Sequence, residues 1–256
     1  MILVHTVFIT FLHTRLFSEI EGTNSDAVAF PREVEFCAAH RQCYRYALHD
    51  NKTGYMVPIG YTGEEPGLQK SKSMWINLHA LLSETSPAGG KDWIYGDMAS
   101  SSERQSIDPD IRTHDVDSDD RVAFITSNGT IERTNTEVGR HTFACSFREV
   151  TNGGTVVRHE KFTLDSTINP RKLVAKSDKT TGCFISYLEN TLMHCALRCH
   201  LHAMCRSFYY NLDIQVCIQT EFVDSLLSRA EAGTVNLRSW RRFARPQWIV
   251  GKSNGK

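Results

Sequence analysis

The stretch Met193–Asn211, MHCALRCHLHAMCRSFYYN, decides the fold of the carboxy-terminal part of this chain. It holds three cysteines and three histidines within twelve residues: Cys195, Cys199 and Cys205, with His194, His200 and His202. Cys195 and Cys199 are four residues apart and share one face of a helix, which suits a zinc site, a cysteine nucleophile with a histidine base, or disulfide bonds. Spacing alone does not distinguish a zinc site, a nucleophile and disulfides. The redox state of the cellular compartment does, so the sequence must first be examined for its destination.

The amino terminus points to the secretory route. Its apolar opening, MILVHTVFITFLHTRLF, predicts a signal peptide over residues 1–22 with cleavage between Phe17 and Gly22. A buried strand or helix is the alternative, because the usual basic start is missing. The apolar run is shorter than the roughly 20 residues that span a bilayer, and no later run is long enough. We therefore expect a secreted, soluble protein without a membrane span.

Two further features agree with secretion. Asn51 and Asn128 each begin an N-glycosylation acceptor triplet, so a glycoprotein is expected. The cysteine count is eight, and an even number in an oxidising compartment favours disulfides. A zinc site formed by Cys199, His202 and Cys205 is disfavoured because oxidation removes thiolate ligands. A nucleophile is disfavoured because it needs a free, activated thiol.

Charge divides the chain into two parts. Residues 1–170 carry 16 Lys/Arg and 23 Asp/Glu, a formal charge of −7, whereas residues 171–256 carry 13 and 6, which is +7. Residues 151–172 contain turn-forming sequences around one short expected strand, Thr155–Phe162, and predict a linker. We expect modules over residues 30–150 and 173–245, followed by a polar tail over 246–256. The opposed charges favour either docking of the two modules or an anionic partner for the basic one.

The periodicity predicts an α+β fold. In the first module, residues 34–48 have helical character, and MVPI, WINL, DWIY and RVAFI are short β-type runs. In the second module, one helix over roughly 188–202 precedes the strand-like runs SFYYN and QVCIQ. The expected architecture is two disulfide-stabilised modules, each with a helix and a sheet.

The second module resembles a PAN/apple domain over residues 173–245. The resemblance rests on Cys195-x3-Cys199-x5-Cys205, the aromatic run Ser207–Asn211, and Cys217-Ile-Gln. It implies one helix on a curved antiparallel sheet and the pairs Cys195–Cys217 and Cys199–Cys205. A module of this size gains from such bridges, which typically add about 2–4 kcal/mol each.

The first module resembles a degenerate C-type lectin-like domain over residues 30–150. The resembling pieces are, in order, Phe36-Cys-Ala-Ala39-x3-Cys43, MVPI with Gly63-Glu-Glu65, Trp75-Ile-Asn-Leu78, Trp93-Ile-Tyr95-Gly-Asp97, Arg121–Ile125, Asn128-Gly129 and Phe143-Ala-Cys145. The resemblance implies a Cys43–Cys145 bridge. The family's second bridge is missing, because Arg121 and Thr136 stand where its cysteines would be. Cys37 and Cys183 remain by elimination and are predicted to join the two modules, with pairing between two chains as the alternative.

The resemblance also raises calcium-dependent sugar binding. Asp108-Pro109-Asp110 could supply one half of such a site, but Ile131-Glu132-Arg133 occupies the other, and Arg133 would oppose a cation. The acidic run 108–120 is interpreted as a solvated loop, with a calcium site as the alternative. No cofactor and no metal are predicted.

We expect a non-catalytic recognition protein that binds glycans or protein surfaces, because no nucleotide loop, hydrolase elbow or metalloprotease motif is present. A nucleic-acid partner is not predicted. The candidate ligand-binding residues are Asp108, Asp110, Arg238, Trp240, Arg241 and Arg242, and with Arg245 the last four could meet sulphated glycans or an acidic protein. The alternatives are a calcium-dependent lectin that uses Asp108-Pro109-Asp110, or a secreted enzyme or inhibitor.

Overall fold

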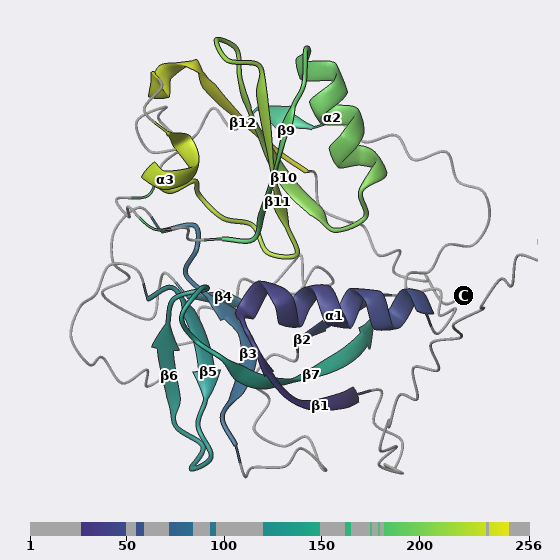
Figure 1. Ribbon diagram of the computed structural model, residues 1–256, viewed down its shortest axis with the longest axis vertical. Helices are drawn as coiled ribbons and strands as arrows, with labels where there is room; N and C mark the ends of the chain where they lie inside the picture. Colours follow the sequence, from purple (N-terminus) through teal and green to yellow (C-terminus); the bar gives the residue numbers. More distant parts are fainter. Residues whose placement is uncertain are drawn as a thin grey trace, which may run out of the picture.

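The computed structural model describes residues 27–49, 55–58, 72–83, 93–95, 120–148, 162–164, 175, 179, 182–233 and 236–245. These residues form two separate sheets, each with one longer helix, so the fold is α+β as predicted (Figure 1). We call strands β1–β7 with α1 the first module, and strands β8–β12 with α2 and α3 the second module. None of the helices in these ranges is long and apolar enough to cross a membrane.

The first module is a mostly antiparallel sheet with one helix. Its elements are β1 (Ala27–Val34), α1 (Phe36–His49), β2 (Tyr55–Pro58), β3 (Met74–His79), β4 (Ile94–Tyr95), β5 (Val122–Ile125), β6 (Ile131–Thr134) and β7 (His141–Arg148). The strand order is β1-β7-β3-β5-β6, with β2 also paired to β7 and β4 to β3. The contact between β3 and β7 is parallel, and the other pairs are antiparallel.

Helix α1 forms because its apolar residues recur at helical spacing. Phe36, Ala39, Cys43 and Ala47 are buried along one face, which packs on the sheet. Trp75 of β3 lies at the centre of this core, with its ring edge-to-face against Phe36 at a centroid distance of 5.4 Å. Helix and sheet therefore share one hydrophobic core, and the Cys43–Cys145 disulfide ties α1 to β7 across it.

A glycine beside Trp75 limits what this core can accept. A Cβ atom built on Gly139 would lie 2.7 Å from Trp75 Cη2 and 2.7 Å from Thr134 Cγ2. Because Trp75 is fully buried, it has little room to move. We predict that Gly139→Ala lowers the free energy of unfolding by about 1–3 kcal/mol through overpacking, measured by urea denaturation. Val138→Ala, at the exposed neighbouring position, is the control and should change it little. Equal midpoints for the two variants would contradict this account.

The second module is a five-stranded antiparallel sheet with α2 on one face. Its elements are β8 (Thr163–Leu164), β9 (Phe184–Leu188), α2 (Leu192–Leu201), β10 (Cys205–Asn211), β11 (Val216–Glu221), α3 (Arg229–Ala232), a 3-10 turn η3 (Leu237–Ser239) and β12 (Trp240–Ala244), in the strand order β8-β12-β10-β11-β9. Thr191 caps α2 by accepting a hydrogen bond from the backbone N–H of His194 at 3.2 Å. The other face of the sheet buries Tyr209, Ile218 and Trp240 against Leu227 and Ala232.

The boundaries of several elements differ from the sequence-based prediction. The first sheet begins at Ala27, ahead of the expected start at residue 30, because β1 pairs with β7. The expected linker contributes β8, which pairs with β12, so the second sheet begins before residue 173. The expected strand Thr155–Phe162 lies almost wholly outside the described residues. Strand pairing, which joins distant segments, explains both shifts.

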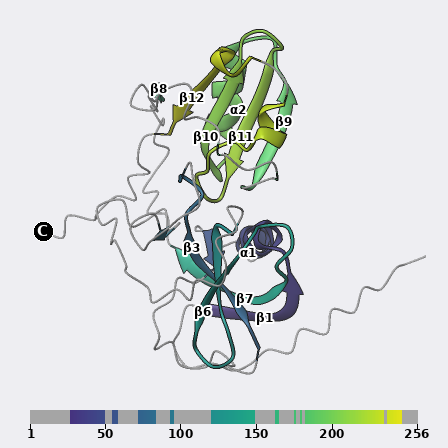
Figure 2. The same cartoon turned by 90° about the vertical axis from the view of Figure 1, so that its left-hand side faces the viewer.

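The two modules meet in a packed junction below the second sheet (Figures 1 and 2). Cys37 of α1 and Cys183 are disulfide-bonded, with a Cα–Cα distance of 5.5 Å. The core of the first module also contains Met204, Phe222 and Val223 of the second. The junction is therefore both covalent and apolar, as the predicted bridge between Cys37 and Cys183 requires.

Polar contacts also cross the junction. The backbone N–H of Leu226 donates to the carbonyl of Leu81 at 2.9 Å. Arg41 of α1 lies 3.9 Å from the carboxylate of Glu221, at the end of β11. The two modules are thus joined by a backbone hydrogen bond and an ion pair as well as by apolar packing.

Candidate functional site

The end of the second module that points away from the junction carries several exposed apolar residues and an exposed arginine. Strand register places the ends of β9 and β10 and the beginnings of β11 and β12 there, since Val216 pairs with both Leu188 and Asn211, and Asn211 pairs with Trp240. Helix α2 begins four residues after the end of β9, at the same end of the module. We call this surface the distal end and define it by six exposed residues: Leu188, Met193, Leu212, Ile214, Leu237 and Arg238.

The predicted basic cluster is only partly on this surface. Arg238 is exposed, and Arg241 is half-buried with its guanidinium donating to the carbonyls of Arg238 and Trp240. Trp240 is buried with 1% exposure, and its indole N–H donates to the carbonyl of Ala232 at 3.4 Å. The expectation of an exposed cluster around Trp240 is therefore corrected, because this ring belongs to the module's core.

Arg242 is also a structural residue. Its guanidinium forms an ion pair with Asp224 beside the sheet, and the hydroxyl of Ser207 donates to the same carboxylate at 2.6 Å. Burial acts to raise the pKa of Asp224, but Arg242 and Ser207 outweigh it and hold that pKa below its ordinary value. Arg242 is thus committed to a buried ion pair and does not face a ligand.

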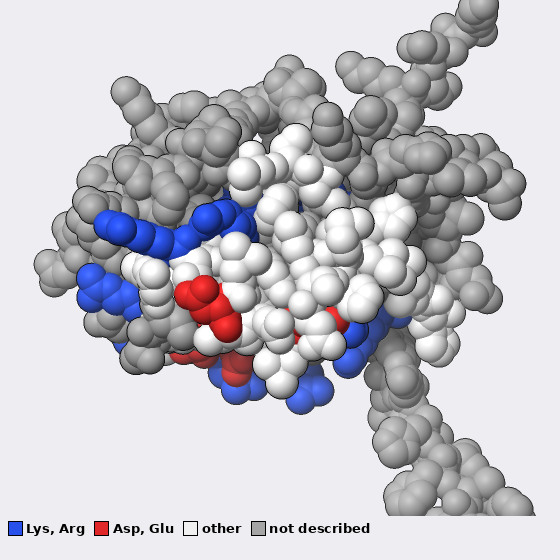
Figure 3. Space-filling view, turned by 90° about the horizontal axis from the view of Figure 1, so that it is seen from above, with Lys and Arg blue, Asp and Glu red and all other residues white. Residues whose placement is uncertain are grey.

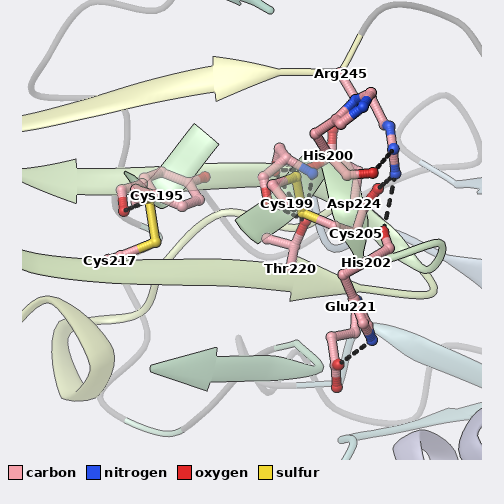
Figure 4. Close-up of a disulfide and its surroundings, with 12 residues drawn as sticks. Cys195, Cys199, His200, His202, Cys205, Cys217, Thr220, Glu221, Asp224 and Arg245 are labelled. Atoms are coloured by element: carbon pink, nitrogen blue, oxygen red, sulfur yellow. Dashed lines mark hydrogen bonds and ion pairs between the residues drawn. A yellow bond between two sulfur atoms is a disulfide. The ribbon is translucent and has the colours of Figure 1, made fainter. Parts of the chain in front are cut away.

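Arg245 holds the carboxy-terminal end of α2. Its guanidinium donates to the backbone carbonyls of His200, His202 and Cys205 at 2.8–3.1 Å (Figure 4). A cation at a helix carboxy terminus satisfies carbonyl groups that have no partner within the helix. Of the four residues expected around the basic terminus, Arg238 and Arg241 are left to contact a partner.

The cysteines of the opening stretch are all oxidised. Cys195 pairs with Cys217 and Cys199 with Cys205, so α2 is fastened to β11 at one point and to the start of β10 at another (Figure 4). Zinc binding by Cys199, His202 and Cys205 is excluded in this state because both thiolates are consumed. His194 is exposed, and His202 lies 3.4 Å from Glu221.

The predicted sites of the first module have different outcomes. Asp108, Asp110 and Asn51 lie outside the described residues. Asn128 is exposed in the turn between β5 and β6, where it is accessible for glycosylation. Arg133 lies on β6, paired with Ala123 of β5. Within the described ranges, no group of three or more His, Cys, Asp or Glu residues could hold a metal ion.

Sequence reasoning missed two buried histidines at the junction. His40 is fully buried on α1, stacked on Phe222 of the second module at 5.6 Å, and neither ring nitrogen has a hydrogen-bond partner in the described part of the chain. Burial, together with the nearby His79 and Arg206, lowers the pKa of His40 to about 3. Burial lowers the pKa of His79 to about 4. The helical spacing of Phe36, His40 and Cys43 was the available signal.

These features combine into one arrangement. Two modules are joined by a disulfide and a packed junction, and five exposed apolar residues with Arg238 lie at the opposite end of the second module. Comparisons with protein-family models, with curated proteins and with solved structures found no match.

Proposed function

We propose that this chain is a secreted, non-catalytic recognition protein in which a C-type lectin-like module is followed by a PAN/apple module. The observation that carries the proposal is the use of the cysteines: all eight form disulfides, which fasten α1 to β7, α2 to β10 and β11, and one module to the other. Disulfides at this density are typical of an oxidising compartment, and a rigid scaffold is what loops need for specific recognition.

Two features support the family assignment. In the first module, the helix carrying Phe36 and Cys43 is bridged to the last strand, with Trp75 in the core between them, the arrangement implied by the resemblance to C-type lectin-like domains. In the second, one helix is fastened by two disulfides to an antiparallel sheet, as implied by the resemblance to PAN/apple domains. The order of modules follows the order of the motifs in the sequence.

The proposed partner is an anionic extracellular glycan or protein surface. Arg238 and Arg241 present cationic groups beside Leu237 at the distal end, and residues 171–256 carry a formal charge of +7. Guanidinium groups suit sulphate and carboxylate because they form charge-assisted hydrogen bonds in a planar fork. Binding is proposed to be independent of calcium, with the Asp108-Pro109-Asp110 site as the alternative.

A glycan array in the presence and absence of calcium tests this proposal. We expect sulphated glycans to bind in both conditions, and Arg238→Glu to weaken binding about tenfold by replacing an attraction with a repulsion. Arg32→Glu, at an exposed position on β1, is the matched control with the same change in net charge and should bind normally. Binding that requires calcium and disappears in Asp108→Ala would support the calcium-dependent lectin instead.

A further inference from the structure

The distal end gathers aliphatic side chains from three described connections of the second module, β9 to α2, β10 to β11, and the turn before β12. Its exposed apolar residues come from the end of β9, the first turn of α2, the β10–β11 turn and the turn before β12. Their exposed fractions are 84% for Leu188, 73% for Met193, 56% for Leu212, 43% for Ile214 and 38% for Leu237. Antiparallel strand pairing brings these connections to one edge of the sheet, so the five side chains lie at the same end of the module.

The chemistry of these side chains indicates which class of partner they suit. All large hydrophobic residues exposed in the described part of the chain are Leu, Val, Met or Ile, so no aromatic side chain is among them. Tight protein interfaces are anchored mainly by Trp, Tyr and Arg, and Leu is under-represented among their anchoring residues. Exposed aliphatic side chains gathered at one end of a module instead suit the acyl boundary of a lipid bilayer, where their burial is favourable.

Two arginines, Arg238 and Arg241, stand beside these apolar residues. Arg238 follows Leu237 directly and Arg241 lies four residues after it. Viewed from above, this end is mostly uncharged, with Lys and Arg side chains at its edge and a few Asp and Glu side chains also in view (Figure 3). Two carboxylates at this end have partners, and one of them, Asp213, stays exposed in the β10–β11 turn. Glu189 is nearly buried and paired with Arg198, and Asp213 accepts a hydrogen bond from Ser239. Cations beside an inserted apolar group are attracted to anionic headgroups.

We propose that the distal end is a lipid-docking surface that inserts Leu188, Leu212 and their neighbours into a bilayer with anionic phospholipid headgroups. Arg238 and Arg241 contact the headgroups at its rim. This inference goes beyond glycan or protein recognition, because that function uses the arginines and leaves five exposed aliphatic side chains without a role. Docked in this way, the protein holds its first module away from the bilayer, since the junction lies at the opposite end of the second module.

Vesicle co-sedimentation of the full chain secreted from a eukaryotic host tests the proposal. The probes are vesicles of phosphatidylcholine alone and of phosphatidylcholine mixed with phosphatidylserine. We expect tighter binding to the mixed vesicles, with the difference shrinking at high salt. Leu188→Ser and Leu212→Ser should each weaken binding about tenfold, because each removes one inserted aliphatic group. Val138→Ser, which alters a 71% exposed apolar residue of the first module, is the control and should bind as the parent does.

The test rests on differences between variants. The apolar residues 1–17 could bind lipid in any molecule that retains them, and this contribution would be the same in every variant. Equal vesicle binding by the Leu188→Ser, Leu212→Ser and Val138→Ser proteins would overturn the proposal. A solution dimer that Leu188→Ser dissociates, with no vesicle binding by the parent, would overturn it in favour of a second copy of this chain. Loss of vesicle binding by Leu188→Ser with glycan binding retained would support lipid docking. It would also show that lipid docking and glycan recognition can be tested independently.

Discussion

Removal of the Cys37–Cys183 bridge is expected to lower the free energy of unfolding by about 4 kcal/mol, through a larger conformational entropy of the unfolded chain. The two cysteines are 146 residues apart, but the Cys43–Cys145 disulfide shortens the covalent path between them. That path runs through six residues from Cys37 to Cys43 and thirty-eight from Cys145 to Cys183. The effective loop is therefore close to forty-five residues, and the estimate follows from that length.

The double variant Cys37→Ser/Cys183→Ser measures this effect without leaving a free thiol. Guanidinium unfolding followed by tryptophan fluorescence gives the free energy. The matched control is Cys199→Ser/Cys205→Ser, whose cysteines are six residues apart, so that a loss of only about 2 kcal/mol is expected. An equal loss in the two double variants would show that loop length does not govern the stabilisation.

Acidification is expected to destabilise the junction. The pKa of His40 is lowered to about 3 and that of His79 to about 4, both from an ordinary value of 6.5. Between these values the unfolded chain binds a proton at each histidine and the folded chain does not. Stability is therefore full above about pH 6.5 and is lost as the pH falls, at roughly 1.4 kcal/mol per pH unit for each histidine. Unfolding free energies measured from pH 7 to pH 4 should fall by several kcal/mol.

A histidine substitution isolates one part of this effect. His40→Leu should reduce the slope of the free energy of unfolding against pH, between pH 6 and pH 4, by roughly 1.4 kcal/mol per pH unit. It should cost little at neutral pH, because both ring nitrogens of His40 lack hydrogen-bond partners within the described ranges and the ring stacks on Phe222. His49→Leu, at the exposed end of the same helix, should leave the slope unchanged. An unaltered slope in His40→Leu would mean that other groups control acid sensitivity.

Local pattern was enough for much of the fold. The apolar spacing of Phe36, Ala39 and Cys43 predicted α1, and the runs around Trp75 and Tyr209 predicted β3 and β10, because helix and strand place side chains at fixed periods. Cysteine spacing and the two resemblances led to all four disulfides, including Cys37–Cys183, which followed by elimination. The helix and strands depend on the pattern of short segments, and the last cysteine pair depends on the number of cysteines. Both can be taken directly from the sequence.

Exposure was decided by the tertiary structure. Trp240, Arg241 and Arg242 alternate along β12, and only the packing of Ala232 and Leu227 against one face of that sheet shows that Trp240 is inside. The local sequence of a basic run that contains a tryptophan is the same whether the tryptophan is buried or exposed. The ligand-binding interpretation of Trp240 and Arg242 failed for this reason.

Contacts between distant segments were also beyond the sequence. The burial of His40 involves Phe222, which lies 182 residues further along the chain and stacks on the His40 ring. Leu188, Leu212 and Leu237 resemble ordinary core residues, because leucine is usually buried. Antiparallel strand order brings their connections to one edge, and no described element covers them there. The sequence by itself therefore determined the elements and the cysteine pairing. Tertiary packing decided which side chains face the junction and which face solvent, since burial depends on neighbours that are remote along the chain.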